Sequence, residues 1–516
     1  MSDHAKKSQK WPITLFTIGV FMAGLDNGII STALTTINDS FGVSSAWGAW
    51  SITLYTLGIA ISVPIIGKLS DNYGRRRLFI IEVALFGIGS LLVALSPNFV
   101  FLLVARFIQA IGGGGIFIIG SSHILSTLPR NKQGKALGLL GGMHGLSAVI
   151  GPNLGAIILS LTGSWHWMFL INLPIALFLV IFGFLKIEET KPGTSKPMDI
   201  VGTMLLSAGI LALMYGITEL DSTAFIQSLR NPQVLLFLIG GIGALVGLVF
   251  YERRVEQRGD DPIIAYSLMK TRLFQLTLCL GLLSGGFLAG IIFIPSFVQQ
   301  VLNIPVESAG YWLTPLALAS GIGAGLGGVL TDKYNAVKTV IFSGVIGAIG
   351  FFLFPAWVSG PLSFIIASVL AGIGLGILLG APLNVLVGAS AGKDEQGSAL
   401  GTLSMVRQIG LTLFPTVYAG FLTGGAKQIE PTLKAEFGHD IIDFEAGTIA
   451  DKEESVGEMM SQIKNIPDEA VREQVLQTVS SVYKVGFDHM FITSGILSLL
   501  VIAVGIYLYA NSKGFK

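Results

Sequence analysis

Residues 67–77 read Gly-Lys-Leu-Ser-Asp-Asn-Tyr-Gly-Arg-Arg-Arg, a short charged elbow between two long apolar stretches. A weaker copy, Gly-Val-Leu-Thr-Asp-Lys-Tyr-Asn, occupies residues 328–335 and is again flanked by apolar stretches. The two copies indicate that the chain is embedded in a membrane and internally duplicated. We therefore expect two related halves, each with one charged elbow at the same membrane face.

The composition fits a membrane-embedded chain. Of its 516 residues, 52% are hydrophobic and 12% are charged, whereas soluble domains carry about 25% charged residues. The apolar runs are about 20 residues long, which is enough to cross the hydrocarbon core of a bilayer. We expect the first run to be a retained helix and not a cleaved leader. The single Cys279 excludes an intrachain disulfide framework and a Cys-based metal site.

Fourteen apolar runs are expected to span the membrane as helices. They lie near residues 12–37, 47–67, 78–96, 99–127, 136–160, 165–185, 199–219, 232–251, 273–301, 309–331, 338–357, 361–391, 397–423 and 488–510. Aligning the two elbows makes spans one to six one half, spans nine to fourteen the other, and spans seven and eight an insertion. The predicted units are residues 1–186, 187–260 and 261–516. Duplicated helical halves are typical of secondary transporters.

The basic residues predict the orientation of the chain in the membrane. With a cytoplasmic N-terminus, 23 of the 32 Lys and Arg residues fall in cytoplasmic segments. We therefore expect a multi-pass protein of the cell membrane with both termini in the cytoplasm. The acidic loop at 424–487 then lies outside, and it has apolar positions at a helical period between Ile463 and Val482. We interpret it as a solvated hairpin; a gate or partner-binding element is the alternative.

Several motifs resemble those of the major facilitator superfamily. The elbow resembles its signature loop, residues 106–112 resemble its fourth-helix Arg motif, and span five resembles its antiporter motif at Gly138, Gly151, Pro152 and Gly155. Residues 25–34 and 165–174 are similar to motifs of the fourteen-helix drug/proton antiporter branch. The resemblance covers nearly the whole chain outside 424–487. It implies an all-α integral membrane fold and proton-coupled export of drug-like compounds by alternating access, with antibiotic resistance as a consequence.

Asp26 and Arg106 are the expected proton-coupling residues. Asp26 lies near the middle of span one, where a carboxylate is costly and marks a functional site by default. At 1.5 Å of rise per residue, the depths of Asp26 and Arg106 in their spans differ by roughly 6 Å. The resemblance implies that both positions border the central cavity and act in coupling. A static ion pair that holds helices together is the alternative.

The substrate cavity is expected to include Asp26, Gln109, Asn172, Arg407 and Gln408. Arg407 stands near mid-membrane on span thirteen, where quaternary-cation exporters of the resembling branch often carry acidic residues. Its charge favours anionic, zwitterionic or amphipathic substrates, or else a structural pair with an acid elsewhere.

Two further polar residues in the spans receive structural interpretations. Glu82 lies about one turn beyond the elbow arginines, so we expect it to snorkel or pair there rather than bind substrate. His123 lies near a helix end and is expected to face water.

The elbow is predicted to act as a conformational latch. Asp71 can accept hydrogen bonds from a neighbouring helix N-terminus, or pair with an Arg, when the cytoplasmic side is closed. These contacts must break on opening, so the latch has two states. The second elbow lacks the arginine run, so the N-terminal latch should dominate. The predicted latch residues are Gly67, Asp71, Gly74, Arg75, Arg76 and Asp332.

The sequence also limits the energy source and the partners. The Gly-rich strings 112–115 and 323–328 lie inside apolar spans with no preceding strand, so helix packing is expected there and not nucleotide binding. No P-loop is present in the sequence, which leaves an ion gradient as the energy source, with no cofactor and no metal expected. The expected partners are a small-molecule substrate, protons and the lipid bilayer, with no nucleic acid, and the chain is expected to be a monomer.

Two other functions compete with drug export. One is export of a single physiological lipid, fatty acid or metabolite, with drug transport incidental. A membrane-bound enzyme or receptor would need a catalytic constellation or a folded soluble domain, and the segment 424–487 offers one His and no Cys.

Overall fold

The fold is all-helical throughout the part of the chain that the structure describes, and it confirms the predicted membrane architecture. A computed structural model describes residues 3–189, 197–221, 224–437, 463 and 466–511. Within these residues, 14 helical segments are long and apolar enough to cross a membrane. They match the predicted spans in number and order, although several ends differ.

The N-terminal half consists of six spans, two of which are broken into consecutive helices. Its helices are α1 (Asp3–Phe41), α2 (Ser45–Tyr73), α3 (Arg75–Ala94), α4 (Phe99–Gly114), α5 (Ile116–Thr127), α6 (Arg130–Thr162), α7 (His166–Leu170) and α8 (Asn172–Lys186). The insertion contains α9 (Ile200–Thr218), α10 (Phe225–Leu229) and α11 (Pro232–Gln257).

The C-terminal half repeats the six-span pattern. A short α12 (Tyr266–Lys270) precedes it. Its helices are α13 (Arg272–Ile291), α14 (Ile294–Gln300), α15 (Val306–Ala309), η1 (Gly310–Leu313), α16 (Thr314–Lys333), α17 (Ala336–Trp357), α18 (Pro361–Gly380), α19 (Pro382–Ser390), α20 (Gln396–Ala426), α21 (Ile429–Phe437) and α23 (Glu469–Ala510).

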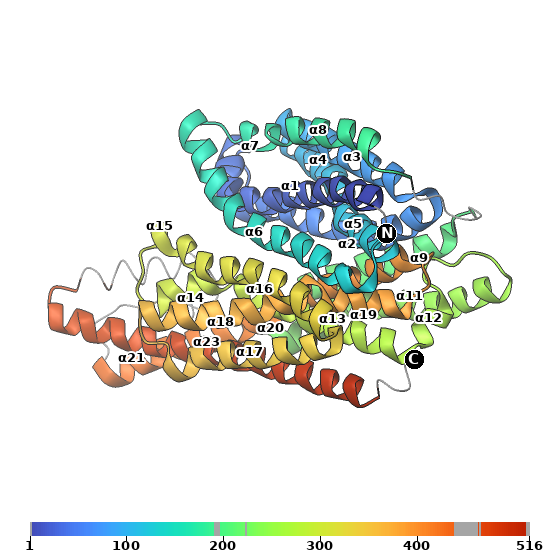
Figure 1. Ribbon diagram of the computed structural model, residues 1–516. Coiled ribbons are helices and arrows are strands. Elements are labelled where there is room, and N and C mark those ends of the chain that lie inside the picture. The colour runs from blue at the N-terminus through green and yellow to red at the C-terminus, as the bar shows by residue number, and fades with distance from the viewer. Residues whose placement is uncertain (1–2, 190–196, 222–223, 438–462, 464–465, 512–516) are drawn as a thin grey trace.

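The two halves meet along two helix pairs, α2 with α20 and α6 with α16 (Figure 1). Both pairs touch at the face of the molecule that carries the elbows, which we call the elbow face. Small residues make this approach possible, because a side chain would collide with the opposite backbone. A Cβ at Gly328 would lie 3.1 Å from the Cα of Gly138, and a Cβ at Gly67 would lie 2.7 Å from the carbonyl carbon of Gly397.

Beyond the middle of the membrane the halves separate. On α6, Gly145 still packs against Gly321 of α16, but Gly151 packs against Gly28 of α1, in its own half. On α20, Gly401 packs against Pro64 of α2, whereas Gly410 packs against Leu282 of α13 in its own half. Figure 1 shows the same arrangement, with the halves together at the right and apart at the left. The close contacts between the halves are therefore concentrated toward the elbow face.

The inserted helices α9 and α11 form a hairpin on the outside of the α2–α20 pair. Leu206, Ile210 and Met214 of α9 share one apolar cluster with Leu57 of α2 and Met405 of α20. The outer surface of α11 exposes large apolar side chains such as Leu236 and Ile239. A hydrocarbon surrounding explains this surface, because soluble proteins rarely expose contiguous apolar patches.

The last two long helices extend past the predicted ends of their spans. We expected span thirteen to end at residue 423 and span fourteen to begin at 488, but α20 runs to Ala426 and α23 begins at Glu469. The helical period near Val475 and Val479 is confirmed, since both side chains are buried on α23, which contacts α21. Residues 438–462 and 464–465 of the predicted loop lie outside the described residues.

The close approach of α6 and α16 leads to a test of the elbow-face contact. We expect Gly328→Val to separate these helices, because the added side chain would collide with α6 near Gly138. Spin labels at Lys132 and Lys338, both exposed at this face in a Cys279→Ser background, would then report a longer distance.

The matched control is Gly325→Val, one turn earlier on the same helix, where a Cβ would meet no atom within 4 Å. It should leave the distance distribution unchanged. Equal distributions for Gly328→Val and the parent protein would contradict a steric contact at this position.

Candidate functional site

A fully buried charged network lies inside the N-terminal half. The Nη1 atom of Arg106 donates to Asp26 Oδ2 at 2.5 Å and to Gln109 Oε1 at 2.7 Å. Gln109 Nε2 in turn donates to Asp26 Oδ1 at 2.7 Å and to Ser90 at 2.8 Å. Asp26, Arg106 and Gln109 all have 0% of their surface exposed. The charges are thus held in a low-dielectric interior, where their attraction is strong.

Helix geometry explains why these residues meet. Arg106 and Gln109 are three residues apart on α4, so they lie on one face of the helix. This face points at Asp26 on α1 and at Ser90 on α3. Gly89 lets α3 approach closely, because a Cβ there would lie 2.6 Å from the Cα of Gln109.

Aromatic and polar groups complete the surroundings of Arg106. Its guanidinium carbon lies 4.1 Å from the ring centroid of Tyr55, a cation–π contact. Asn172 extends the network, since its Nδ2 lies 3.4 Å from Asp26 Oδ1 and 3.3 Å from Ser90. The Nη2 atom of Arg106 and the hydroxyl of Tyr55 are buried without a hydrogen-bond partner.

The residues predicted for the substrate cavity fall into two groups. Asp26, Gln109 and Asn172 are completely buried, so in this conformation they do not face accessible space. Arg407 and Gln408 lie on α20 in the other half and are partly exposed. The structure does not bring the two groups together, and the assignment of the first group to the cavity stays a prediction.

Arg407 has no acidic partner among the described residues. Its Nε donates to Ser284 of α13 at 3.2 Å, while its Nη2 is buried and makes no hydrogen bond. The ion pairs of the described residues do not include it. The expected alternative of a structural pair with an acid is therefore not found in this part of the chain.

Asp71 closes the elbow face by binding the start of a helix from the other half. Its carboxylate accepts from the backbone N–H groups of Gly397 at 3.1 Å and Ser398 at 3.0 Å, in the first turn of α20. The helix dipole favours a negative charge there. Arg75 lies 3.3 Å from the same carboxylate and also donates to Ser122 at 2.8 Å. Both expected contacts of Asp71 are therefore present.

Asp332 makes the matching contact on the other side of the molecule. Its carboxylate accepts from the backbone N–H groups of Gly134 at 2.7 Å and Lys135 at 2.9 Å, near the start of α6. The weaker elbow thus keeps the two-bond contact although it lacks an arginine run. The expected dominance of the N-terminal latch stays a prediction.

The partners of the two latch carboxylates are a second duplicated motif, which our sequence analysis missed. Residues 133–138 read Gln-Gly-Lys-Ala-Leu-Gly and residues 396–401 read Gln-Gly-Ser-Ala-Leu-Gly. In each copy the first Gly and the next residue donate their backbone N–H groups to an Asp of the opposite half. A search for internal repeats around the elbows would have found this pair.

Gly74 and Arg76 contact the segment that follows α8 and not the C-terminal half. Gly74 has φ of 98°, a conformation that side chains rarely adopt. The backbone N–H groups of Arg76 and Arg77 each donate to Glu189 at 3.1 Å. Glu189 therefore caps the start of α3, a role that the sequence did not reveal.

The predicted antiporter motif divides between two interfaces. Gly138 contacts α16 of the other half, whereas Gly151 and Gly155 contact α1. A Cβ at Gly28 would lie 2.7 Å from Pro152 Cδ, so α1 and α6 are in close contact two residues from Asp26. The motif thus connects the charged network to the helix that closes the elbow face.

The interpretations of Glu82 and His123 are wrong. Glu82 is 1% exposed and accepts a hydrogen bond from the N–H of Gly115 at 3.0 Å. The break between α4 and α5 leaves this N–H without a helical partner, and the carboxylate supplies one. His123 is 3% exposed, with its ring 5.1 Å from that of Phe16, so it does not face water.

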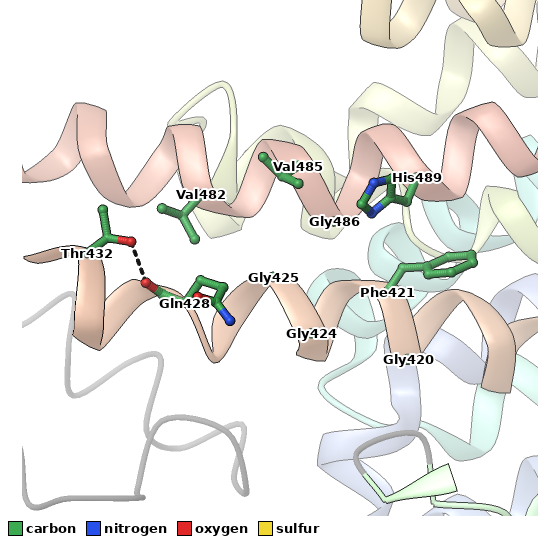
Figure 2. A pocket seen from close by; sticks show the side chains of 10 residues that line it. All are labelled: Gly420, Phe421, Gly424, Gly425, Gln428, Thr432, Val482, Val485, Gly486 and His489. Carbon is green, nitrogen blue, oxygen red and sulfur yellow. Dashed lines mark hydrogen bonds between the residues drawn. The ribbon is translucent and has the colours of Figure 1, made fainter. Parts of the chain in front are cut away.

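A separate hollow of about 480 Å³ lies between α20 and α23, well away from the charged network (Figure 2). Figure 2 shows Phe421 and His489 at one end and Thr432 at the other. Gly425 and Gly486 bring the two helices together at its floor, where a Cβ on Gly425 would lie 3.4 Å from the Cα of Gly486. None of the predicted site residues lines this hollow.

The family of the chain follows from comparison with known proteins. Residues 16–415 match the family described as Major Facilitator Superfamily. The chain belongs to this superfamily. This finding confirms the resemblance drawn from the motifs.

Relatives agree with this assignment. The chain is 59% identical over 500 residues to the uncharacterized MFS-type transporter YfiU of Bacillus subtilis, which covers 96% of each chain. It is 32% identical over 418 residues to Multidrug resistance protein 3 of the same organism, covering 80% of this chain and 79% of that one. The solved structure of the proton:xylose symporter XylE has a TM-score of 0.59 at 14% identity and covers 96% of both chains. At that identity the likeness concerns the fold alone.

The latch carboxylates can be compared directly by mutation. We expect Asp71→Asn to lower the closed population of the elbow face more than Asp332→Asn does. Asp71 also pairs with Arg75, whose Nη2 donates to the carbonyl of Lys393 in the other half at 3.4 Å, so neutralisation of Asp71 weakens a second contact between the halves. The distance between spin labels at Lys132 and Lys338 would measure both variants. A larger opening in Asp332→Asn would contradict the predicted dominance of the N-terminal latch.

The buried ion pair leads to a stability test. Arg106→Gln should destabilise the protein strongly, by about 3–5 kcal/mol, because it leaves the Asp26 carboxylate buried without a cation. The double variant Asp26→Asn with Arg106→Gln removes both charges and should regain much of the loss. Thermal unfolding in detergent would compare them.

Arg472→Gln is the control, since Arg472 is 31% exposed by side chain and its partner Glu469 is 84% exposed. It should change the unfolding temperature little. If the double variant were no more stable than Arg106→Gln alone, an unpaired buried charge could not be the cause.

Proposed function

We propose that this protein is a proton-coupled exporter of amphipathic, drug-like compounds that works by alternating access. The observation that carries the proposal is the Asp26–Arg106 pair, which is fully buried in the membrane domain of a superfamily transporter. Ionisable groups at such positions typically serve as proton relays. The relative named Multidrug resistance protein 3 supports drug-like compounds as cargo.

The elbow face is assigned to the cytoplasm in this proposal. The excess of Lys and Arg in the segments on this side supports the assignment. With the elbow face closed by Asp71 and Asp332, the conformation described above is the outward-facing one. Protonation would then reach the N-terminal half from outside.

Proton coupling would act through the contacts of Asp26. A neutral Asp26 loses its charge attraction to Arg106 and can no longer hold Arg106 and Gln109 as a carboxylate does. Because Gly28 of α1 packs on Gly151 of α6, a shift of α1 would be felt by α6. α6 also carries Gly134, whose N–H binds Asp332 across the halves. Helix α6 thus links proton binding at Asp26 to the latch contact of Asp332.

The cycle follows from these parts. A substrate enters from the cytoplasm or the inner leaflet when the latch is open. After closure of the elbow face, protonation of Asp26 from outside accompanies release of the substrate. Return to the inward-facing state delivers the proton to the cytoplasm, so that the proton gradient drives export.

Export of one physiological lipid, fatty acid or metabolite is the second candidate. The observation in its favour is Arg407, a cation without an acidic partner among the described residues. Such a group suits a carboxylate better than a quaternary ammonium ion. Competition between a fatty acid and an organic cation in one transport assay would separate the two candidates.

The proposal is tested by transport in proteoliposomes under an imposed pH gradient. A screen of cationic, neutral and anionic amphipathic dyes should identify compounds that the wild-type protein moves in exchange for protons. Asp26→Asn keeps the size of the side chain and removes its proton site. We expect it to abolish gradient-driven transport while dye binding remains.

Arg472→Gln, at a partly exposed position in the N-terminal turn of α23, is the transport control and should behave as wild type. Proton-driven export that persists in Asp26→Asn would exclude Asp26 as the coupling residue. Transport of no dye under any gradient would overturn the proposed function itself.

A further inference from the structure

Arg407 presents an unsatisfied positive charge in the middle of the membrane domain. It lies 11 residues after the first residue of α20, Gln396, which corresponds to roughly 16 Å of helix rise. Its Nη2 atom is buried and has no hydrogen-bond partner in the described part of the chain. A buried cation without a counter-charge costs free energy, and an anion brought against it would lower that cost.

The backbone of Arg407 packs directly against α13 of its own half. A Cβ at Gly285 of α13 would lie within 3 Å of both Leu411 N and the carbonyl carbon of Gly410, so the two helices are in direct backbone contact here. The Arg407 Nε is also tied to Ser284, which is fully buried. The guanidinium is therefore held by its own half with one edge satisfied and one edge free.

The opposite wall is supplied by the N-terminal half. His144 of α6 is exposed although it lies in the middle of the helix, and it is within electrostatic range of Arg407. Its ring lies 6.3 Å from that of Phe117 on α5. A Cβ at Gly24 would lie 3.4 Å from His144 Nδ1, which places this wall two residues from Asp26.

Three buried carboxylates of the membrane domain are already engaged by other groups. Asp26 is held by Arg106 and Gln109, and Glu82 binds the N–H of Gly115. Asp71 binds the start of α20. An external anion is therefore the natural counter-charge for Arg407.

We propose that Arg407 binds the anionic group of the substrate, in a subsite completed by His144 and Phe117 from the other half. The guanidinium would bind a carboxylate or sulfonate, His144 would add a hydrogen bond, and Phe117 would pack on an aromatic or apolar part of the same molecule. This inference rests on the proposed export function and specifies its substrate class as amphipathic anions or zwitterions.

The position of the subsite gives it a place in the transport cycle. One half supplies the cation and the other supplies the wall, so a bound anion contacts both halves at once. A ligand that contacts both sides stabilises whichever conformation brings them to the right separation. The His144 side of the subsite adjoins α1, the helix that carries Asp26.

The test compares two dyes that differ in a single group. Rhodamine B carries a free carboxylate, and its ethyl ester has the same cationic ring system with the carboxylate blocked. Binding of each dye to the purified full-length protein in nanodiscs would be measured by fluorescence polarisation. We expect the wild-type protein to bind the acid more tightly than the ester.

Substitutions should then remove this preference. Arg407→Gln should weaken binding of the acid by at least about tenfold, because a charge-assisted hydrogen bond is lost, and leave the ester unchanged. Arg407→Lys keeps the charge without the planar fork, so it should lose only part of the preference. Arg472→Gln changes the net charge equally at a distant site and should bind both dyes as wild type does.

Two outcomes would overturn the subsite. One is an acid affinity of Arg407→Gln within twofold of wild type; the other is wild-type protein that does not bind the acid or does not prefer it. Gel filtration and thermal unfolding would confirm that each variant is folded, and Arg407→Lys provides a second variant if Arg407→Gln is not. Transport of the ester is measured separately. If one of these two binding results is found but Arg407→Gln still transports the ester in exchange for protons, the anion subsite is wrong and the export function stands.

Discussion

A carboxylate that has no access to water must be balanced by a cation and by hydrogen bonds, and the N-terminal half is built around this requirement. Asp26 has both oxygens engaged, one by Arg106 and the other by Gln109. To bring these groups together, α3 and α4 must approach closely, and Gly89 permits it. The abundance of glycine in this chain thus has a specific use around its buried charges.

The same requirement distinguishes the two halves. In the N-terminal half the buried guanidinium of Arg106 forms an ion pair with Asp26 through its Nη1 atom. In the C-terminal half the guanidinium of Arg407 has only Ser284. The halves share their helix order and their latch contacts but differ in the charge that they present at mid-membrane. This asymmetry is the basis for proposing a proton site in the N-terminal half and a ligand site in the C-terminal half.

The architecture was predictable because hydrocarbon imposes simple rules on sequence. Span length, the elbow repeat and the bias of Lys and Arg were enough to predict the fourteen helices and their arrangement, and the motif at Arg106 led to the predicted pairing with Asp26.

The pairing of Glu82 with Gly115 was not predictable, because the break between α4 and α5 is not visible in an apolar run. The same holds for Glu189, since a cap contributed from more than 100 residues away has no local signal. The groups that donate to Asp71 were hidden because they are backbone N–H groups, although the repeat at 133–138 and 396–401 marked their position.

The reciprocal arrangement of this repeat makes the contact between the halves isologous, as in a two-fold symmetric dimer. Each half contributes one carboxylate, and near the N-terminal end of one of its helices it also donates two backbone N–H groups to the carboxylate of the other half. Both halves are therefore hydrogen-bond donor and acceptor at once. A rigid rotation of one half that breaks the first contact also strains the second. In the proposed cycle we therefore expect the elbow face to open as a unit, with a single chain reproducing the cooperativity that a dimer obtains from two identical subunits.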